Sequence, residues 1–192
     1  MSSFYTLFWR IMVYIEDGQG TGRKAGVNDE NRVLANCVTE SLEHHTNVEE
    51  GEAYNYSMSE TPAASGATIV YIKNESDKNI ILEGIQIMNQ ETQMYEASLG
   101  DTGTPAGTVT VTPASLNAGA GNVADGVFYA GSNITGLAQG TIIYKAWQIG
   151  GSGTQGNNFV MDVVIPKNQT FVVRTGITGS KTQITIPMYY HE

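Results

Sequence analysis

The chain has 192 residues, a formal net charge of −9, one cysteine and 15% charged residues. That length suits one domain with appendages, and 22 glycines and ten tyrosines among many Thr, Asn and Val favour short strands and tight turns over amphipathic helices. A single cysteine, Cys37, excludes an intrachain disulfide, and an acidic chain without a basic stripe argues against direct contact with nucleic acid. We therefore expect an all-β protein.

Residues 2–15 form the most apolar segment of the chain. The segment is shorter than the roughly 20 residues that span a membrane, it carries Arg10, and it lacks a basic leading region and a cleavage site, so neither a membrane span nor a signal peptide is predicted. Alternate residues share one strand face, which favours burial against a partner; they are Tyr5, Leu7, Trp9, Ile11, Val13 and Ile15. The alternative is that translation starts at Met12, which leaves residues 1–11 incidental.

The following glycine-rich segment, Gly18 to Lys24, is similar in composition to a phosphate-binding loop. Its spacing does not fit one, because Arg23 stands where a glycine is needed and Ala25 stands where Ser or Thr is needed. A hinge is the favoured interpretation.

Residues 23–56 read as an arm. A turn-forming cluster leads into an apolar run and then an acidic stretch, and residues 16–60 together hold ten Asp or Glu and three Lys or Arg. No nucleophile, base and orienting group come together there, so we expect the arm to lie on a neighbouring surface. The expected interface residues are Tyr5, Leu7, Trp9, Val33, Leu34, Val38, His44 and His45.

A short helix is predicted over residues 41–50. Ser41 suits the N-cap position and Gly51 suits a terminator. His44 and His45 are adjacent and no third ligand has a suitable spacing, so no metal or cofactor is expected.

Strand-sized segments follow the break at residues 62–66. Residues 67–74 and 80–88 flank a turn at 75–79, which predicts a β-hairpin. In the second strand we expect Ile81, Ile85 and Ile87 on one face, Leu82 on the other, and a bulge at Gly84.

Further strands are predicted at residues 92–99, 109–112, 141–149, 159–165, 169–175 and 181–190. Residues 117–140 are rich in Gly, Ala and Asn, which predicts long loops around a short strand at 127–130. Inward positions are expected at Phe159, Met161, Val163 and Ile165, and at Ile184, Ile186, Met188 and Tyr190.

The expected fold is an antiparallel β-sandwich, with a jelly roll as the specific form, preceded by an extended N-terminal arm. The arm is assigned to residues 1–56 and the sandwich to residues 57–192. The three histidines, His44, His45 and His191, lie outside the expected inner strands, so a metal-dependent cupin enzyme is not predicted. The carboxylates of the body show no spacing that selects a catalytic pair, and we expect no enzyme activity.

The segments 24–34 (KAGVNDENRVL), 43–45 (EHH) and 50–55 (EGEAYN) resemble the leading part of virion structural proteins of tailed bacteriophages. Residues 165–175 (IPKNQTFVVRT) also resemble the late strands of viral jelly rolls. The resemblance implies a non-enzymatic homotrimer in the virion, assembled in the host cytoplasm. It further implies a capsid decoration or cement subunit whose partner is the major capsid protein or another virion protein.

A second function stays open: a tail or head-fibre component that binds host surface glycans. Exposed aromatic side chains could form a platform for a sugar, and the candidates are Trp147, Tyr189 and Tyr190.

Overall fold

The computed structural model describes residues 26–27, 33–34, 42–150, 157–176 and 178–191. The chain divides into two compact units, Met1–Glu40 and Ser41–Glu192, and we call the second unit the body. In the first unit, β1 (Gly26–Val27) pairs antiparallel with β2 (Val33–Leu34).

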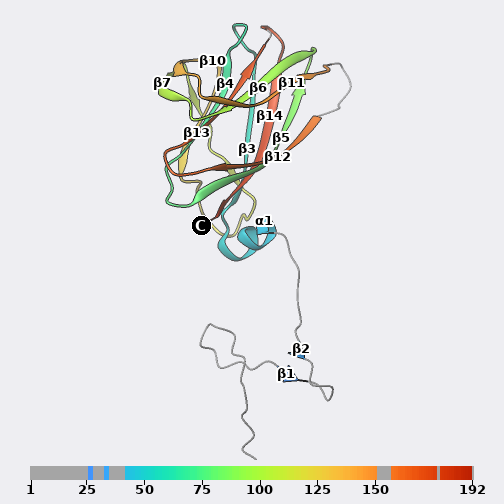
Figure 1. Ribbon diagram of the computed structural model, residues 1–192, viewed down its shortest axis with the longest axis vertical. Coiled ribbons are helices and arrows are strands. Elements are labelled where there is room, and N and C mark those ends of the chain that lie inside the picture. The colour runs from blue at the N-terminus through green and yellow to red at the C-terminus, as the bar shows by residue number, and fades with distance from the viewer. Residues whose placement is uncertain (1–25, 28–32, 35–41, 151–156, 177, 192) are drawn as a thin grey trace, which may run out of the picture. The chain divides into compact units, whose positions relative to one another are not determined.

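The body is built from two antiparallel sheets (Figure 1). The seven-stranded sheet has the order β11 (Thr141–Gln148), β6 (Gln93–Leu99), β13 (Thr170–Thr175), β4 (Thr68–Asn74), β10 (Gly126–Ala138) and β7 (Thr102–Ala106), and β8 (Val109–Thr110) also pairs with β10. The five-stranded sheet has the order β12 (Asn157–Ile165), β5 (Asn79–Asn89), β14 (Thr182–His191), β3 (Ala53–Glu60) and β9 (Ala114–Ser115). Two short helical elements precede β3, namely α1 (Leu42–His45) and η1 (Thr46–Glu50). The predictions of an all-β protein, a β-sandwich and a short helix over residues 41–50 are confirmed.

One hydrophobic core lies between the two sheets and takes side chains from both. Alternate residues of each strand enter it, because successive side chains of a strand point to opposite faces. In β14 the buried positions are the predicted ones, Ile184, Ile186, Met188 and Tyr190. Each such side chain stabilises the fold by about 1.5–3 kcal/mol through burial.

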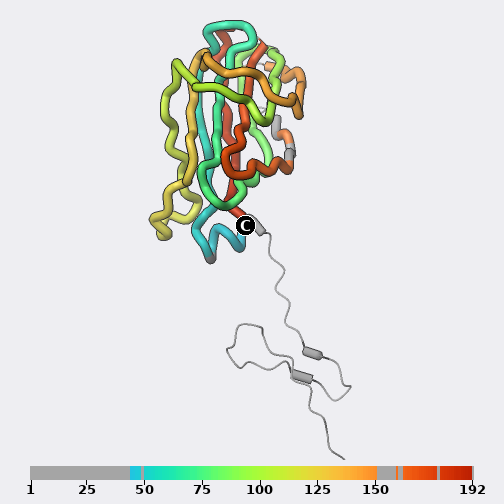
Figure 2. Tube along the Cα trace, turned by 60° about the vertical axis from the view of Figure 1, so that its left-hand side comes forward, coloured from blue at the N-terminus to red at the C-terminus, as the bar shows by residue number. Residues whose placement is uncertain are grey.

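The strands of the body pair from the two ends of the chain inward. The antiparallel pairs are β3 with β14, β4 with β13, β5 with β12, β6 with β11 and β7 with β10. The first four pairs alternate between the five-stranded and the seven-stranded sheet. In Figure 2 the first strand of the body, in blue-green, accordingly runs beside the last strand, in red.

The predicted hairpin of residues 67–74 and 80–88 is wrong. The two strands form as expected, but β4 belongs to the seven-stranded sheet and β5 to the five-stranded sheet. The turn between them crosses from one sheet to the other. Asn74 stabilises the crossing, because its side-chain Nδ2 donates to the carbonyls of Lys78 at 2.7 Å and Ile165 at 2.8 Å.

Gly84 does lie at a bulge, as predicted: near this residue the register of β5 shifts in its pairing with β12 and also in its pairing with β14. The bulge moves the following residues to the opposite face. Leu82 and Ile85 therefore both enter the core, while Ile81 points outward and contacts Ala53 and Tyr189. The predicted common face of Ile81, Ile85 and Ile87 is wrong for this reason.

Residues 117–140 contain β10, a strand of 13 residues, rather than the predicted loops around a short strand. Its first part pairs with β4 and its last part pairs with β7, with a register shift between Ala130 and Ile134. The shift places Ile134 on the outer face of the seven-stranded sheet, where it packs with Tyr71 and Val172.

Residues 53–56 were assigned to the arm from sequence, but they form the first half of β3. Tyr54 and Tyr56 lie in the core, and the ring of Tyr54 meets that of Tyr190 edge to face, with centroids 5.7 Å apart. The division into compact units falls after Glu40. The body therefore includes everything from Ser41 onward.

Candidate functional site

Residues 42–52, which we call the junction, carry α1 and η1 and lead into β3. The helical segment ends at Gly51, which adopts the left-handed conformation at φ 68° and donates its N–H to the Thr46 carbonyl. A β-carbon at Gly51 would lie 2.3 Å from that of Ala120, so a side chain does not fit there. Gly51 is thus the terminator that the sequence predicted.

The junction is fixed to the body by side chains and by the end of β14. Asn122 Nδ2 donates to the Glu50 carbonyl at 2.8 Å, and the Tyr190 N–H donates to the Glu52 carbonyl at 3.1 Å. Lys78 Nζ lies 2.7 Å from the Glu52 carboxylate and 3.5 Å from that of Glu50. The hydrogen bond to Glu52 raises the pKa of Lys78. The junction is therefore held in a defined position against β14 and Asn122.

The predicted interface residues fall into three groups. Tyr5, Leu7, Trp9 and Val38 lie outside the described residues. Val33 and Leu34 form β2, for which the backbone pairing with β1 is described. His44 and His45 lie in the last turn of α1, and both are exposed at the junction. A role for these residues at an interface stays a prediction.

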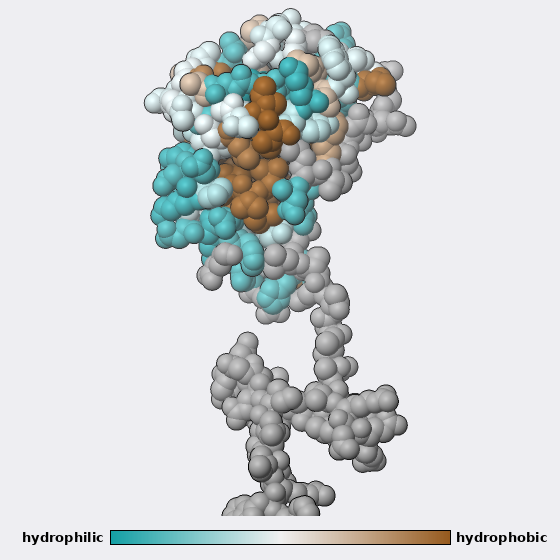
Figure 3. Space-filling model, in the orientation of Figure 1, coloured by the Kyte–Doolittle hydropathy of each residue, from teal (hydrophilic) through white to brown (hydrophobic). Residues whose placement is uncertain are grey.

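Large apolar side chains are exposed at several places on the body. Figure 3 shows one face of the body, on which a brown hydrophobic band runs lengthwise between teal hydrophilic side chains in its lower part. The exposed large hydrophobic residues among those described are Val48, Met88, Val109, Leu116, Val123, Ile142, Ile143, Trp147, Ile149 and Val164. Four of the ten lie within residues 142–149, so β11 and its end are the main concentration.

β11 is an edge strand that exposes large apolar residues beside Lys145. Trp147 is 68% exposed and Ile149 is 80% exposed, and β6 is the only strand that pairs with β11 in the described part of the chain. On the opposite face Gln148 is fully buried, and its Nε2 donates to the Ile87 carbonyl. The buried Gln148 therefore holds β11 in an orientation that leaves Trp147 and Ile149 exposed to solvent. The alternation of residues in the sequence did not by itself reveal this orientation.

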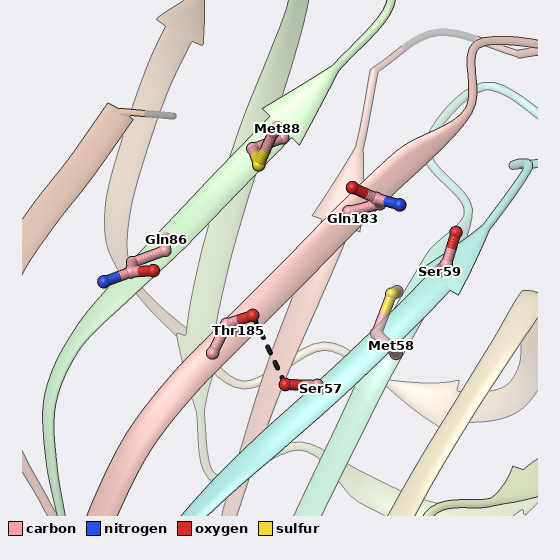
Figure 4. Close-up of a pocket in the computed structure, with 7 residues that line it drawn as sticks. All are labelled: Ser57, Met58, Ser59, Gln86, Met88, Gln183 and Thr185. Atoms are coloured by element: carbon pink, nitrogen blue, oxygen red, sulfur yellow. Dashed lines mark hydrogen bonds between the residues drawn. The ribbon is translucent and has the colours of Figure 1, made fainter. Parts of the chain in front are cut away.

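A hollow of about 400 Å³ lies on the outer face of the five-stranded sheet (Figure 4). Its lining comes from three adjacent strands: Ser57, Met58 and Ser59 on β3, Gln183 and Thr185 on β14, and Gln86 and Met88 on β5. The hydroxyls of Ser57 and Thr185 lie 3.3 Å apart and share a hydrogen bond. Hydroxyl and amide groups both donate and accept hydrogen bonds, so this uncharged groove suits a neutral polar ligand. Apart from Met58, which belongs to the core, these residues alternate with core positions in each strand, and that alternation is the signal that could have located them.

The three predicted sugar-platform residues do not come together. Tyr190 is buried in the core and its hydroxyl donates to the Asp125 carbonyl at 2.8 Å. Tyr189 is buried against Ile81. Trp147 is exposed, but it is not among the residues that line the groove.

A buried ion pair occupies the outer side of the seven-stranded sheet. Asp101 is completely buried and pairs with the guanidinium of Arg174. Its Oδ1 also accepts from the Ser98 hydroxyl at 2.6 Å and from the Gly140 N–H at 3.2 Å. Both carboxylate oxygens are engaged, so the pair ties β6, β13 and the start of β11 together.

Among the described residues, no group of three His, Cys, Asp or Glu side chains could hold a metal ion. None of the described helices is long and apolar enough to cross a membrane. His191, the last residue of β14, is exposed.

Comparison with known proteins finds no match to this chain among protein-family models, curated proteins or solved structures. The family expected from the arm sequence therefore stays a prediction.

Proposed function

We propose that this protein is a structural component of a tailed-phage virion, a decoration or cement subunit that attaches to the capsid through its N-terminal arm. The observation that carries this proposal is the strand order of the body, which is the order expected of a jelly roll. Jelly rolls recur in viral capsid proteins and in lectins, where they serve as rigid bodies for assembly and recognition.

The nested strand pairs support the jelly roll. In that fold an antiparallel ribbon wraps into two layers, so successive pairs of the ribbon alternate between two sheets. Here β3–β14 and β5–β12 lie in the five-stranded sheet, whereas β4–β13 and β6–β11 lie in the seven-stranded sheet. The remaining strands extend the two sheets at the opposite edge: β7, β8 and β10 in the seven-stranded sheet, and the short β9 in the five-stranded sheet.

The junction supports attachment through the arm. The body has its own core, and the junction holds the first residues of the body against β14 through the Tyr190 N–H bond to Glu52. Residues 1–40 form a separate compact unit. An anchored body with a separate leading unit suits a subunit that is fixed to a larger particle. The resemblance of residues 24–34 and 50–55 to phage virion proteins points to the same particle class.

The partner would be the major capsid protein or another virion protein, and the subunit would be a homotrimer assembled in the host cytoplasm. The net charge of −9 favours a protein partner over nucleic acid, because an acidic surface repels phosphate. No step of this function requires a cofactor or catalysis.

The copy number of the protein in purified particles tests the proposal. A decoration subunit covers the shell and is present in many copies, which quantitative gel densitometry against the major capsid protein measures. A count of a few dozen or fewer per particle would contradict a decoration role.

The groove on the five-stranded sheet favours a second candidate function, binding of a host glycan by a tail or head-fibre component. Its uncharged hydroxyl and amide groups match a polyhydroxylated ligand. A glycan array followed by calorimetry tests this, with Thr185→Val and Gln86→Ala as variants and Thr178→Val, exposed elsewhere, as the control. Binding that both groove variants leave unchanged would exclude the groove.

A further inference from the structure

The edge formed by β11 and Ile149 is a preformed template for an additional strand. Unpaired edges of sheets invite pairing with another chain, and proteins usually protect them with charges, bulges or a covering segment. On β11 the protection is incomplete: a register shift at Ile143 and the charge of Lys145 are present, but Trp147 and Ile149 face solvent. The five residues from Tyr144 to Gln148 run in unbroken register with β6.

The β11 edge is also held in one position. The ring of Tyr144 packs on that of Phe159 in β12, with centroids 4.9 Å apart, and Gln148 is buried at the other end of the strand. Lys145 Nζ lies 3.2 Å from the Glu96 carboxylate of the neighbouring strand. A strand fixed in this way pays little ordering cost when another strand joins it.

We propose that this edge receives residues 5–15 of a second copy of this chain as an added strand. The segment has the required sequence, because one of its strand faces is apolar or aromatic at every position from residue 5 to residue 15 and would align beside Trp147 and Ile149. The lengths also fit: residues 5–15 span about 36 Å and the eight residues of β11 about 27 Å at ~3.3 Å per residue.

We take a second copy as the occupant, because exchange between copies gives every β11 edge an added strand. Residues 1–40 and the body are separate compact units, and β11 has β6 as its one strand partner in the described part of the chain. The 26 residues between Ile15 and Leu42 reach at most about 90 Å when extended, which is ample to reach a neighbouring body. Each copy would be donor and acceptor at once, which closes a symmetric oligomer.

This inference goes beyond attachment to a shell, because it concerns contact between copies and is compatible with either proposed function. Residues 33–45 of the arm would remain available to the particle. Self-association in solution and attachment to particles are separate measurements, so one can fail without the other.

Paired variants test the exchange by sedimentation velocity on the full chain. The acceptor variant carries Trp147→Lys and Ile149→Lys, and the donor variant carries Leu7→Lys and Trp9→Lys. We expect the unaltered chain to form oligomers, each variant alone to be monomeric, and an equimolar mixture to form a heterodimer, since each then supplies the part that the other lacks. Val123→Lys, at a residue 73% exposed elsewhere on the body, is the control and should leave the oligomer intact.

Three outcomes would overturn the proposal: a monomeric unaltered chain at micromolar concentration, an acceptor variant that still self-associates, or a mixture that stays monomeric. Circular dichroism of each variant establishes that its body is folded, which keeps a failure of association interpretable.

Tryptophan fluorescence provides a second readout, because Trp9 and Trp147 are the two tryptophans of the chain. In a Trp9→Phe variant, Trp147 is the sole reporter, and its emission should shift to the blue as concentration rises and the added strand covers it. Adding Leu7→Lys should remove the shift. An oligomer in which Trp147 emission stays that of an exposed indole would place the contact on another surface and contradict the proposal.

Discussion

The outer faces of the two sheets are used in opposite ways. On the seven-stranded sheet the outer face is covered in the middle, at β4 and β13: Tyr71 and Val172 are buried with Ile134 of β10, and the fully buried Asp101 pairs with Arg174. On the five-stranded sheet the outer face carries hydroxyl and amide side chains around an open groove, with a small apolar cluster at Ala53, Ile81 and Tyr189.

The difference follows from the insertion between β6 and β11. The chain between these strands contains β7 to β10, and Ile134 of β10 packs on Tyr71 and Val172 after the register shift. The seven-stranded sheet is therefore packed on both faces at β4 and β13, while the five-stranded sheet keeps one face for solvent or a ligand. Substitutions under the cover of the seven-stranded sheet should therefore cost more stability than substitutions on the open face of the five-stranded sheet.

The largest expected loss of stability comes from Asp101→Ala. The substitution leaves the Arg174 guanidinium buried without its partner, and breaking a buried pair in this way costs about 3–5 kcal/mol. Urea unfolding measures the change. Asp77→Ala is the matched control, because Asp77 also pairs with a cation, Lys167, but its side chain is 92% exposed. Similar midpoints for the two variants would show that burial of the Asp101 pair contributes nothing.

Ile134→Ala tests the apolar cover of the seven-stranded sheet. Ile134 is almost fully buried against Tyr71 and Val172, and removal of such a side chain costs about 2–4 kcal/mol. Met88→Ala, at the open groove of the five-stranded sheet, should cost about 0.5 kcal/mol. If thermal or urea unfolding showed that the two variants lose the same free energy of unfolding, the two faces would be equivalent and our interpretation would be wrong.

Alkaline pH tests the core that both sheets share. Burial raises the pKa of Tyr95 to about 12 and also raises the pKa of Tyr56 and Tyr190 above the ordinary value. These groups contribute full stability below pH ~10, where an unfolded chain keeps its tyrosines protonated. Stability should fall as pH rises from about 10 to about 12, because the unfolded state loses protons first. Urea midpoints across this range, with Tyr95→Phe expected to lessen the slope, measure the effect.

Deletion of residues 1–40 should have the smallest effect on unfolding. The compact body starts at Ser41, and the described residues of its core begin at Tyr54. The truncated chain should keep the urea midpoint of the full chain and lose attachment to particles that lack the protein, measured by co-sedimentation. Attachment equal to that of the full chain would move the contact to the body. A deletion of residues 1–56 should instead prevent folding, because it removes Tyr54 and Tyr56 of β3.

The strands could be predicted because alternation is a local property. Phe159, Val163 and Ile165 point inward and Val164 outward, as the two-residue period of β12 required. The partner of each strand could not be predicted in the same way. The turn at residues 75–79 has the composition of a hairpin, yet it crosses between sheets, and that choice is made by the pairing of β4 with β13 far along the chain.

Glycine-rich composition also misled prediction over residues 117–140. Glycine weakens strands on average, but in β10 the register shift after Ala130 and the crossing over the sheet need small residues, among them Gly136 at φ 82°. The exposure of Trp147 was also difficult to predict, because aromatic strand residues are usually buried. The feature that indicates its exposure is the burial of its neighbour Gln148.

The pairing of β3 with β14 sets when this body can form during synthesis. β3 is the first strand of the body to be synthesised and β14 is its last, and Ala53 meets Tyr189 only in the finished sheet. A nascent chain therefore exposes β3 and β5 without their shared neighbour until residues 182–191 emerge. Topologies rich in such distant contacts fold slowly, on the scale of milliseconds to seconds, and their unfinished edges aggregate. The five-stranded sheet can thus form only after residues 182–191 have emerged, and shielding of β3 and β5 before that point should limit aggregation.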